Sequence, residues 1–167
     1  MKHKNAEFWI RKLGLRAHPE GGYYRETYRS DERIKTGSLP GRYGSGRAFS
    51  TAIYFLLKGS QVSKFHRLKS DEIWHYHSGS PLTVYLISPA GRLEKKRLGP
   101  SLDPGEDFQV IIKKGSWFGA AVDKENSYTL MGCTVAPGFD FRDFELADRD
   151  QMLRKYPRHE KIIKELT

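Results

Sequence analysis

Apolar and aromatic residues along this chain occur in short runs rather than in long helical stripes. Runs rich in β-branched and aromatic residues lie at 23–29, 49–57, 73–77, 82–88, 108–112 and 127–135. Turn-forming pairs such as Lys58-Gly59 and Lys114-Gly115 punctuate them. Because many short strands follow one another without helical segments between them, the pattern predicts an all-β sandwich or barrel.

The helical patterns are confined to the two ends of the chain. Asn5 is suited to cap a short helix that runs through Leu13, and Gly14 can supply its left-handed stop. Near the other end, Asp148 can cap a second helix before Pro157 interrupts the pattern. The next apolar face would consist of Ile162, Ile163 and Leu166.

The chain has 167 residues, which fits a single domain. We expect the barrel to occupy about residues 20–146 and a helical tail to occupy 148–166. The lone cysteine, Cys133, excludes an internal disulfide and suits a reducing compartment. No apolar run approaches the roughly 20 residues needed to span a bilayer. We therefore expect a cytoplasmic protein with no membrane partner.

The formal charge of +9 is unevenly distributed. Residues 1–70 hold 15 Lys and Arg against 5 Asp and Glu. No helix-turn-helix, zinc-finger or RNA-binding signature accompanies this charge, so we expect no nucleic-acid partner. An anion-attracting pocket or simple solubility explains it better. The glycine-rich stretch 35–47 is either a mobile surface loop or a basic lid over the barrel mouth.

Polar residues are densest between 65 and 79, and their spacing is specific. His66, Leu68, Glu72 and Gly79 fall on the four positions of the first cupin motif, which normally reads His, His, Glu and Gly. The second cupin motif places a glycine three residues before a histidine, and here Phe118 follows Gly115 at that spacing. The segments HPEGGYYRET (18–27) and SDEIWH (70–75) resemble one largely uncharacterised branch of the cupin superfamily.

This resemblance implies a cupin double-stranded β-helix, that is, a jelly-roll barrel with short N- and C-terminal helices. It also implies a small molecule bound in the barrel and association as a homodimer. Metal-dependent cupins hold their ion with three histidines and a glutamate, whereas only His66 and Glu72 remain here. A catalytic metal normally keeps at least three protein ligands. We therefore expect no metal cofactor, with weak divalent binding at His66 and Glu72 left open.

The two retained residues also suit acid/base chemistry, because the resemblance places both inside the barrel. The arrangement is similar to that of metal-free cupin epimerases, which act on nucleotide-linked keto-sugars. On this interpretation His66 is the catalytic base and Glu72 orients it. The alternatives are a structural polar pair, a non-catalytic metabolite-binding or sensing module, and a metal-dependent oxygenase or isomerase with an atypical ligand set. Tyrosines 24, 54 and 76 are the candidate proton donors, and arginines 25, 47 and 67 could hold a phosphate or carboxylate.

Alternation along the strand that follows Ser70 gives the expected pocket lining. It sends Glu72, Trp74 and Tyr76 inward and His75 and His77 outward, unless a bulge reverses the order. The substrate-binding residues that we predict are Glu20, Tyr24, Arg25, Trp74, His75, Tyr76, Gln109 and Trp117.

Overall fold

The computed structural model describes residues 4–102 and 105–167 as two packed antiparallel sheets with a helix at one end of the chain and helices at the other. The first sheet has the order β1-β2-β5-β12-β7-β10. Its strands are β1 (Arg16–Ala17), β2 (Tyr23–Arg29), β5 (Thr51–Lys58), β12 (Tyr128–Ala136), β7 (Asp71–Gly79) and β10 (Gln109–Ile112). The second sheet has the order β13-β6-β11-β8-β9. Its strands are β13 (Glu145–Leu146), β6 (Val62–Arg67), β11 (Trp117–Val122), β8 (Leu82–Ile87) and β9 (Leu93–Leu98). This is the jelly-roll barrel expected from the sequence.

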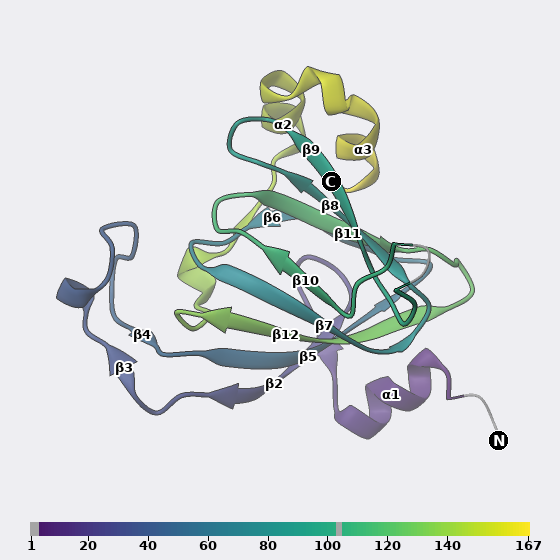
Figure 1. The fold of residues 1–167 in the computed structure, drawn as a ribbon, viewed down its shortest axis with the longest axis horizontal. Helices are drawn as coiled ribbons and strands as arrows, with labels where there is room; N and C mark the ends of the chain where they lie inside the picture. Colours follow the sequence, from purple (N-terminus) through teal and green to yellow (C-terminus); the bar gives the residue numbers. More distant parts are fainter. Residues whose placement is uncertain (1–3, 103–104) are drawn as a thin grey trace.

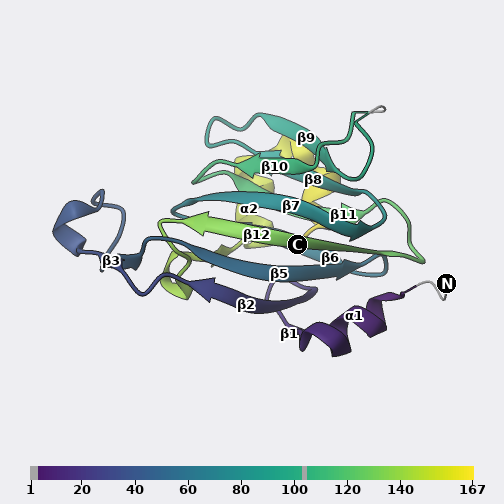
Figure 2. The same cartoon turned by 60° about the horizontal axis from the view of Figure 1, so that its bottom comes forward.

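The core lies between the two sheets, whose inner faces supply alternate residues (Figures 1 and 2). Phe55 and Trp74 from the first sheet meet Leu82 and Phe118 from the second, and all four are at most 2% exposed. Burying a large apolar side chain contributes roughly 1.5–3 kcal/mol. This shared core therefore holds the sheets together as one barrel.

The terminal helices cover the outer faces of the sheets. Helix α1 (Ala6–Leu13) is capped by Asn5, whose Oδ1 accepts a hydrogen bond from the Phe8 amide at 3.0 Å, and it ends at Gly14. It packs beneath the six-stranded sheet, where Leu56 is buried. Helices α2 (Arg149–Lys155) and α3 (Glu160–Glu165), joined by a 3-10 turn at Pro157–His159, lie over the five-stranded sheet (Figure 1). The expected caps and the apolar tail are confirmed.

The glycine-rich stretch forms a hairpin that stands apart from the barrel. Strands β3 (Arg33–Ile34) and β4 (Arg47–Ala48) pair with each other and flank a 3-10 turn at Thr36–Ser38. The hairpin extends away from the two sheets (Figures 1 and 2). The loop between its two strands is anchored to the barrel by the hydroxyl of Tyr43, which contacts the Lys69 carbonyl at 3.0 Å and Ser70 Oγ at 2.9 Å. The lid interpretation is therefore wrong for this structure, because the cavity described below is lined by residues outside 35–47.

Candidate functional site

One end of the barrel is filled with side chains and the other end is hollow. The hollow end is a cavity of about 400 Å3, which we call the barrel cavity. It lies where β5 and β7 begin and where β6 and β12 end. A 3-10 turn, η2 (Phe141–Asp143), covers part of it. The lining residues are Arg16, His18, Glu20, Tyr24, Glu26, Arg29, Thr51, Ile53, Phe55, His66, Leu68, Glu72, Trp74, Cys133, Val135, Phe139, Asp140, Phe141 and Phe144.

A tight glycine turn brings Glu20 to the cavity wall. Gly21 and Gly22 have φ values of 111° and 71°, which favour glycine. A Cβ on Gly21 would lie 2.2 Å from the Val62 carbonyl oxygen, so only glycine lets this turn approach β6 so closely. The Lys64 amide donates to the Glu20 carbonyl at 2.8 Å. The turn therefore docks on β6 and points the Glu20 side chain at the residue that follows Phe65.

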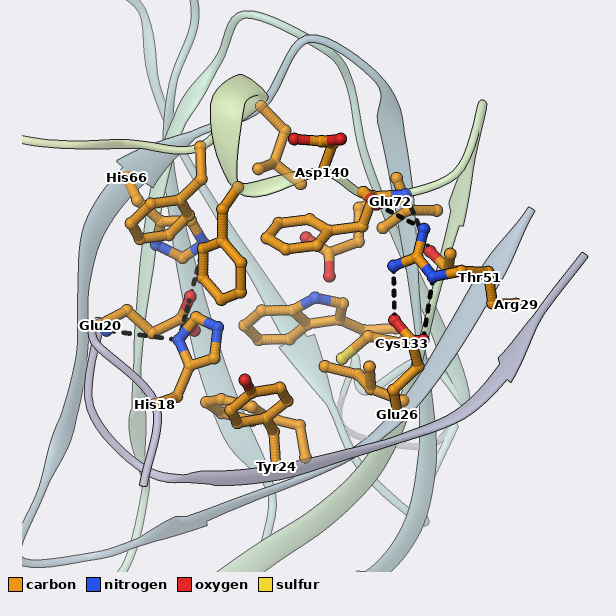
Figure 3. A pocket seen from close by; sticks show the side chains of 18 of the residues that line it. His18, Glu20, Tyr24, Glu26, Arg29, Thr51, His66, Glu72, Cys133 and Asp140 are labelled. Carbon is orange, nitrogen blue, oxygen red and sulfur yellow. Dashed lines mark hydrogen bonds and ion pairs between the residues drawn. The ribbon is translucent and has the colours of Figure 1, made fainter. Parts of the chain in front are cut away.

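That residue is His66, and its carboxylate partner is Glu20 rather than Glu72. His66 Nε2 lies 3.1 Å from Glu20 Oε2, and His18 Nδ1 lies 3.3 Å from the same oxygen (Figure 3). Ser63 donates to Glu20 Oε1 at 2.8 Å. Within the described part of the chain no hydrogen bond or ion pair joins His66 to Glu72. The expected direct pairing of these two residues is wrong, because the distant turn at Glu20 reaches His66 first.

The hydrogen-bond partners place the protons in this His18-Glu20-His66 cluster. His66 Nδ1 contacts the Lys64 carbonyl at 2.7 Å, and a carbonyl only accepts, so Nδ1 carries the hydrogen. His18 Nδ1 accepts from the Glu20 amide at 3.3 Å. Both imidazole nitrogens that face Glu20 Oε2 are therefore bare when the rings are neutral. A hydrogen on Oε2 can be donated to one of these nitrogens, so the arrangement favours protonation of Glu20.

Burial favours the same neutral cluster. It lowers the pKa of His66 to about 3 and that of His18 to about 4. It raises the pKa of Glu20 well above its usual range, and the neighbouring Glu72 carboxylate raises it further. Desolvation penalises the charged form of each group. Burial therefore favours the uncharged form of all three groups, a carboxylic acid held between two neutral imidazoles.

Glu72 is a second and separate carboxyl group on the cavity wall. It is 7% exposed, and burial raises its pKa to about 7, although the Trp74 indole and the Cys133 thiol beside it oppose that rise. The Trp74 Nε1 atom is buried without a well-formed hydrogen bond. The Glu72 carboxyl lies beside this indole and the Cys133 thiol and lines the cavity (Figure 3). Glu72 therefore exchanges its proton near neutral pH.

Aromatic rings line most of the remaining wall. His66 packs on Phe118 with ring centroids 4.0 Å apart, and Phe118 pairs with His66 across β11 and β6. Leu68 lines the cavity near them. Leu68 and Phe118 hold the two positions where the metal-binding cupin motif has histidines. At those positions this barrel has apolar packing.

The η2 turn is held over the cavity by a buried ion pair. Arg47 and Asp143 form two hydrogen bonds of 2.6 Å each, and both residues are at most 6% exposed. The Phe139 amide also donates to Thr51 Oγ1 at 2.9 Å. These contacts fix the aromatic residues 139, 141 and 144 against the cavity. Arg47 thus supports the wall and does not point into it.

Charged side chains gather at the mouth of the cavity. Arg29 donates to both carboxylate oxygens of Glu26, at 2.6 and 3.0 Å, and to the Phe139 carbonyl at 3.1 Å. Arg16 lies over the ring of Tyr24, 5.0 Å from its centroid. The Asp140 carboxylate is held by Arg142 at 2.8 and 2.6 Å. The Arg16 side chain has neither a hydrogen bond nor an ion pair with any residue that the structure describes.

The structure brings some of the predicted site residues together and places others elsewhere. Glu20, Tyr24, His66, Glu72 and Trp74 line the barrel cavity. Alternation along β7 is confirmed, since Glu72 and Trp74 are buried while His75 and His77 point outward. The register of β12 against β7 shifts only beyond these inward residues, between the partners Tyr76 and Ser78.

The other predicted binding residues do not reach the cavity. Arg25 is exposed on the outer face of β2, and His75 bonds to Gln109 and Thr134 on the outer face of the sheet. Tyr76 points inward but donates to the Gly79 carbonyl at the filled end of the barrel. Trp117 is buried beneath the C-terminal helices, with the Arg67 guanidinium 4.5 Å above its ring.

The candidate proton donors and the candidate anion-binding arginines also lie in different parts of the structure. Tyr24 is the one candidate tyrosine of the three that lines the cavity, because Tyr54 packs against His77 on the outer face. Arg67 forms a bidentate pair with Glu145 at 2.7 and 2.9 Å.

Sequence reasoning missed His18, Arg16, Glu26 and Arg29. Arg29 reaches the cavity only because the pairing of β2 with β5 shifts between Glu26 and Tyr28, which reverses the side-chain alternation. His18 lies in the segment 18–27, from which Glu20 and Tyr24 are predicted as binding residues. The segment therefore indicates the site, although His18 itself is not among the predicted residues.

Two further properties of the described residues bear on partners. They contain no group of three or more His, Cys, Asp and Glu side chains placed to hold a metal ion. Among the same residues no helix has the length and apolar character of a membrane span.

Two sheets enclosing a polar and aromatic cavity define a cupin barrel. The family comparison agrees, since residues 7–147 match the model of the Cupin superfamily (DUF985), and the chain belongs to this family. It is 32% identical over 137 residues to the uncharacterized protein YML079W of Saccharomyces cerevisiae, covering 75% of this chain and 67% of the yeast protein.

Solved structures show the same fold. Protein SO0799 from Shewanella oneidensis is 41% identical with a TM-score of 0.88, covering 98% of this chain and 97% of its own. A hypothetical protein from Leishmania major is 38% identical with a TM-score of 0.89, covering 98% of each chain. An oxalate decarboxylase OxdC mutant from Bacillus subtilis is only 15% identical, with a TM-score of 0.55 over 92% of this chain and 37% of its own, and shows the fold alone.

Proposed function

We propose that this cupin is a metal-independent acid/base isomerase or epimerase, which moves a proton on a sugar-like or anionic metabolite in its barrel cavity. The observation that carries the proposal is that two separate proton-exchanging groups line one cavity. One is Glu72, and the other is the His18-Glu20-His66 cluster. Burial raises the pKa of both carboxyl groups, Glu20 and Glu72, and raised carboxyl pKa values are typical of groups that act as general acids and bases near neutral pH.

The proposed roles follow from the protonation states. The Glu72 carboxylate, with a pKa of about 7, removes a proton from a carbon next to a carbonyl group. The electron pair moves to the carbonyl oxygen, and the protonated Glu20 cluster or the Tyr24 hydroxyl returns a proton to carbon. One proton is taken and one is given, so the step requires no oxidant or reductant. His66 then acts through Glu20, because both of its ring nitrogens are already engaged.

Proton exchange with solvent tests this proposal directly. The protein is incubated in D2O with a panel of nucleotide-linked keto-sugars, sugar phosphates and 2-oxo acids, and loss of the C–H signal next to the carbonyl is followed by NMR. We expect catalysed exchange on at least one probe. Loss of a general base or acid should slow it by about 10²–10⁴-fold in Glu72→Gln and Glu20→Gln.

Glu94→Gln is the matched control, because this carboxylate is half exposed on the edge strand β9 and lies outside the cavity. Its exchange rate should equal that of the unmodified protein. Exchange that persists in both Glu72→Gln and Glu20→Gln contradicts the proposal, as does a panel without any exchange.

The second candidate is a metabolite-binding or sensing module without turnover. The engagement of both His66 nitrogens favours it, since a satisfied polar cluster also serves to position a ligand. Thermal shifts with the same panel distinguish the two functions. A probe that raises the melting temperature in proportion to its concentration, but whose C–H signals persist in D2O, identifies a binding module.

A further inference from the structure

We infer that the ligand of the barrel cavity has two parts, an uncharged hydrogen-bonding ring held inside beside Glu72 and a single carboxylate or phosphate group held at the mouth by Arg16. The inference rests on the proposed function only in taking this cavity as the ligand site, and it adds which end of the ligand enters.

The interior of the barrel cavity favours a ligand group that is polar but uncharged. Glu72 is more than nine-tenths buried and lines the cavity beside the Trp74 indole and the Cys133 thiol, and Trp74 Nε1 is buried without a well-formed hydrogen bond. Buried polar groups are normally paired, so a ligand group that accepts from the Trp74 indole relieves the cost of leaving it unpaired. A hydroxyl or amide group accepts from the indole and donates to the carboxylate.

An anionic group is excluded from the same place. The ionisable groups inside are the carboxyl groups Glu20 and Glu72 and the imidazoles His18 and His66, and burial keeps both imidazoles uncharged at neutral pH. The Cys133 thiol is buried and its pKa is raised, so it is also uncharged. A carboxylate or phosphate placed there would lose its water and gain no cation, which is costly.

The mouth supplies the cation that the interior lacks. Arg29 neutralises Glu26 and Arg142 neutralises Asp140, so Arg16 remains without an acidic partner within the described chain. Arg16 pairs with Tyr24 across β1 and β2, which places its side chain at the edge of the cavity (Figure 3 shows the Tyr24 ring below the cavity). A guanidinium binds carboxylate and phosphate equally well by paired N–H groups.

The aromatic lining and the volume of the cavity favour a ring as the inner part of the ligand. Six aromatic side chains line it, from Tyr24, Phe55, Trp74, Phe139, Phe141 and Phe144. The volume of about 400 Å3 lies in the small-molecule range of roughly 300–1,000 Å3. Flat rings and the apolar faces of sugars both pack against such walls.

Matched ligand pairs test the inference. The pairs are uridine with uridine 5′-monophosphate, glucose with glucose 6-phosphate, and 3-(4-hydroxyphenyl)propanamide with 3-(4-hydroxyphenyl)propanoate, titrated by calorimetry at low and physiological ionic strength. We expect the anionic member of at least one pair to bind about fivefold tighter, which is the upper range for a partly exposed ion pair. The pairs that respond show whether phosphate or carboxylate is preferred.

Two variants separate the two parts of the ligand. Arg16→Ala should remove the preference within a pair and leave the neutral member unchanged, whereas Glu72→Gln should weaken both members. Arg25→Ala is the matched control, because Arg25 follows Tyr24 on β2 but points to the outer face. It should retain the preference.

Equal binding of both members in every pair overturns the inference. So does a preference that survives Arg16→Ala, and so does the absence of binding by every anionic probe. Failure of the proposed function is a separate result, because a probe can show the Arg16-dependent preference while its C–H signals persist in D2O.

Discussion

Replacing Glu72 by glutamine should change how the stability of the protein depends on pH. The substitution keeps the shape of a buried side chain but removes its ability to ionise. In the folded protein the pKa of Glu72 is raised from 4.5 to about 7 because the carboxyl is buried. The unfolded chain lacks this burial, so its pKa there is the ordinary one.

The sign of the effect follows from that difference. Below pH 4.5 the carboxyl is protonated in both states and stabilises neither. As pH rises toward 7 the unfolded state releases its proton first, so the free energy of unfolding of the unmodified protein falls. At about 1.4 kcal/mol per pKa unit, the loss amounts to about 3 kcal/mol once both states are ionised. The Glu72→Gln variant cannot ionise at this position, so its free energy of unfolding does not include this loss.

Urea unfolding followed by tryptophan fluorescence, from pH 4.5 to above pH 7, measures the effect. The variant minus the unmodified protein should give a difference that grows with pH. The lowered pKa values of His18 and His66 act in the opposite direction, but they are present in both proteins and cancel in the difference. Removing the Glu72 charge also lowers the pKa of Glu20, which adds to the difference in the same sense.

A difference that stays constant over this range would refute the reasoning. A difference that shrinks as pH rises would show that the ionised carboxylate is stabilised by a cation in the folded protein.

The remaining predictions concern the support of the cavity and its chemistry. Asp143→Asn leaves the Arg47 guanidinium buried without its charge partner and should lower the free energy of unfolding by about 3 kcal/mol, measured in urea. Glu145→Gln, which breaks an exposed pair, should cost less than about 1 kcal/mol, and equal losses would contradict the burial argument. Gly21→Ala should destabilise by about 2 kcal/mol or more, because its φ is 111° and its Cβ would overlap Val62, whereas Gly37→Ala has free space around it and should be neutral; a stable Gly21→Ala protein would show that the turn can move. Elemental analysis of purified protein should find less than one equivalent of iron, manganese, nickel and zinc together, and a full equivalent whose removal by a chelator lowers the melting temperature would reverse this expectation.

The strands that sequence predicted well are those rich in β-branched and aromatic residues. Strands β5, β7, β8 and β12 appear within two residues of the predicted ranges, as do β10 and the mostly exposed β2, and the facing of Glu72 and Trp74 follows from simple alternation. Strands β6, β9 and β11 were missed, and for β9 and β11 the reason can be read from their composition. β9 is an edge strand with a run of charged residues, which protects an exposed edge, and β11 is rich in glycine and alanine.

The site was predicted only in part because its key contact is non-local. The family motif identifies His66 and Glu72, but spacing within one segment cannot show that Glu20, from a turn far earlier in the chain, reaches His66. Arg29 could not be placed because a register shift lies between it and Tyr24. The burial of Arg47 was unpredictable in the same way, since its partner Asp143 is distant in sequence.

The position of His18 and Glu20 at the edge of the sheet affects how the His18-Glu20-His66 cluster is lost on heating. His18 and Glu20 belong to the segment that joins β1 to β2, and β1 has two residues and pairs with β2 alone at the edge of its sheet. Such a segment is among the least protected parts of a fold. Detachment of this edge would separate Glu20 from His66 and admit water to the cavity while the central strands stay paired. The proposed activity would therefore be lost on heating before the barrel itself melts.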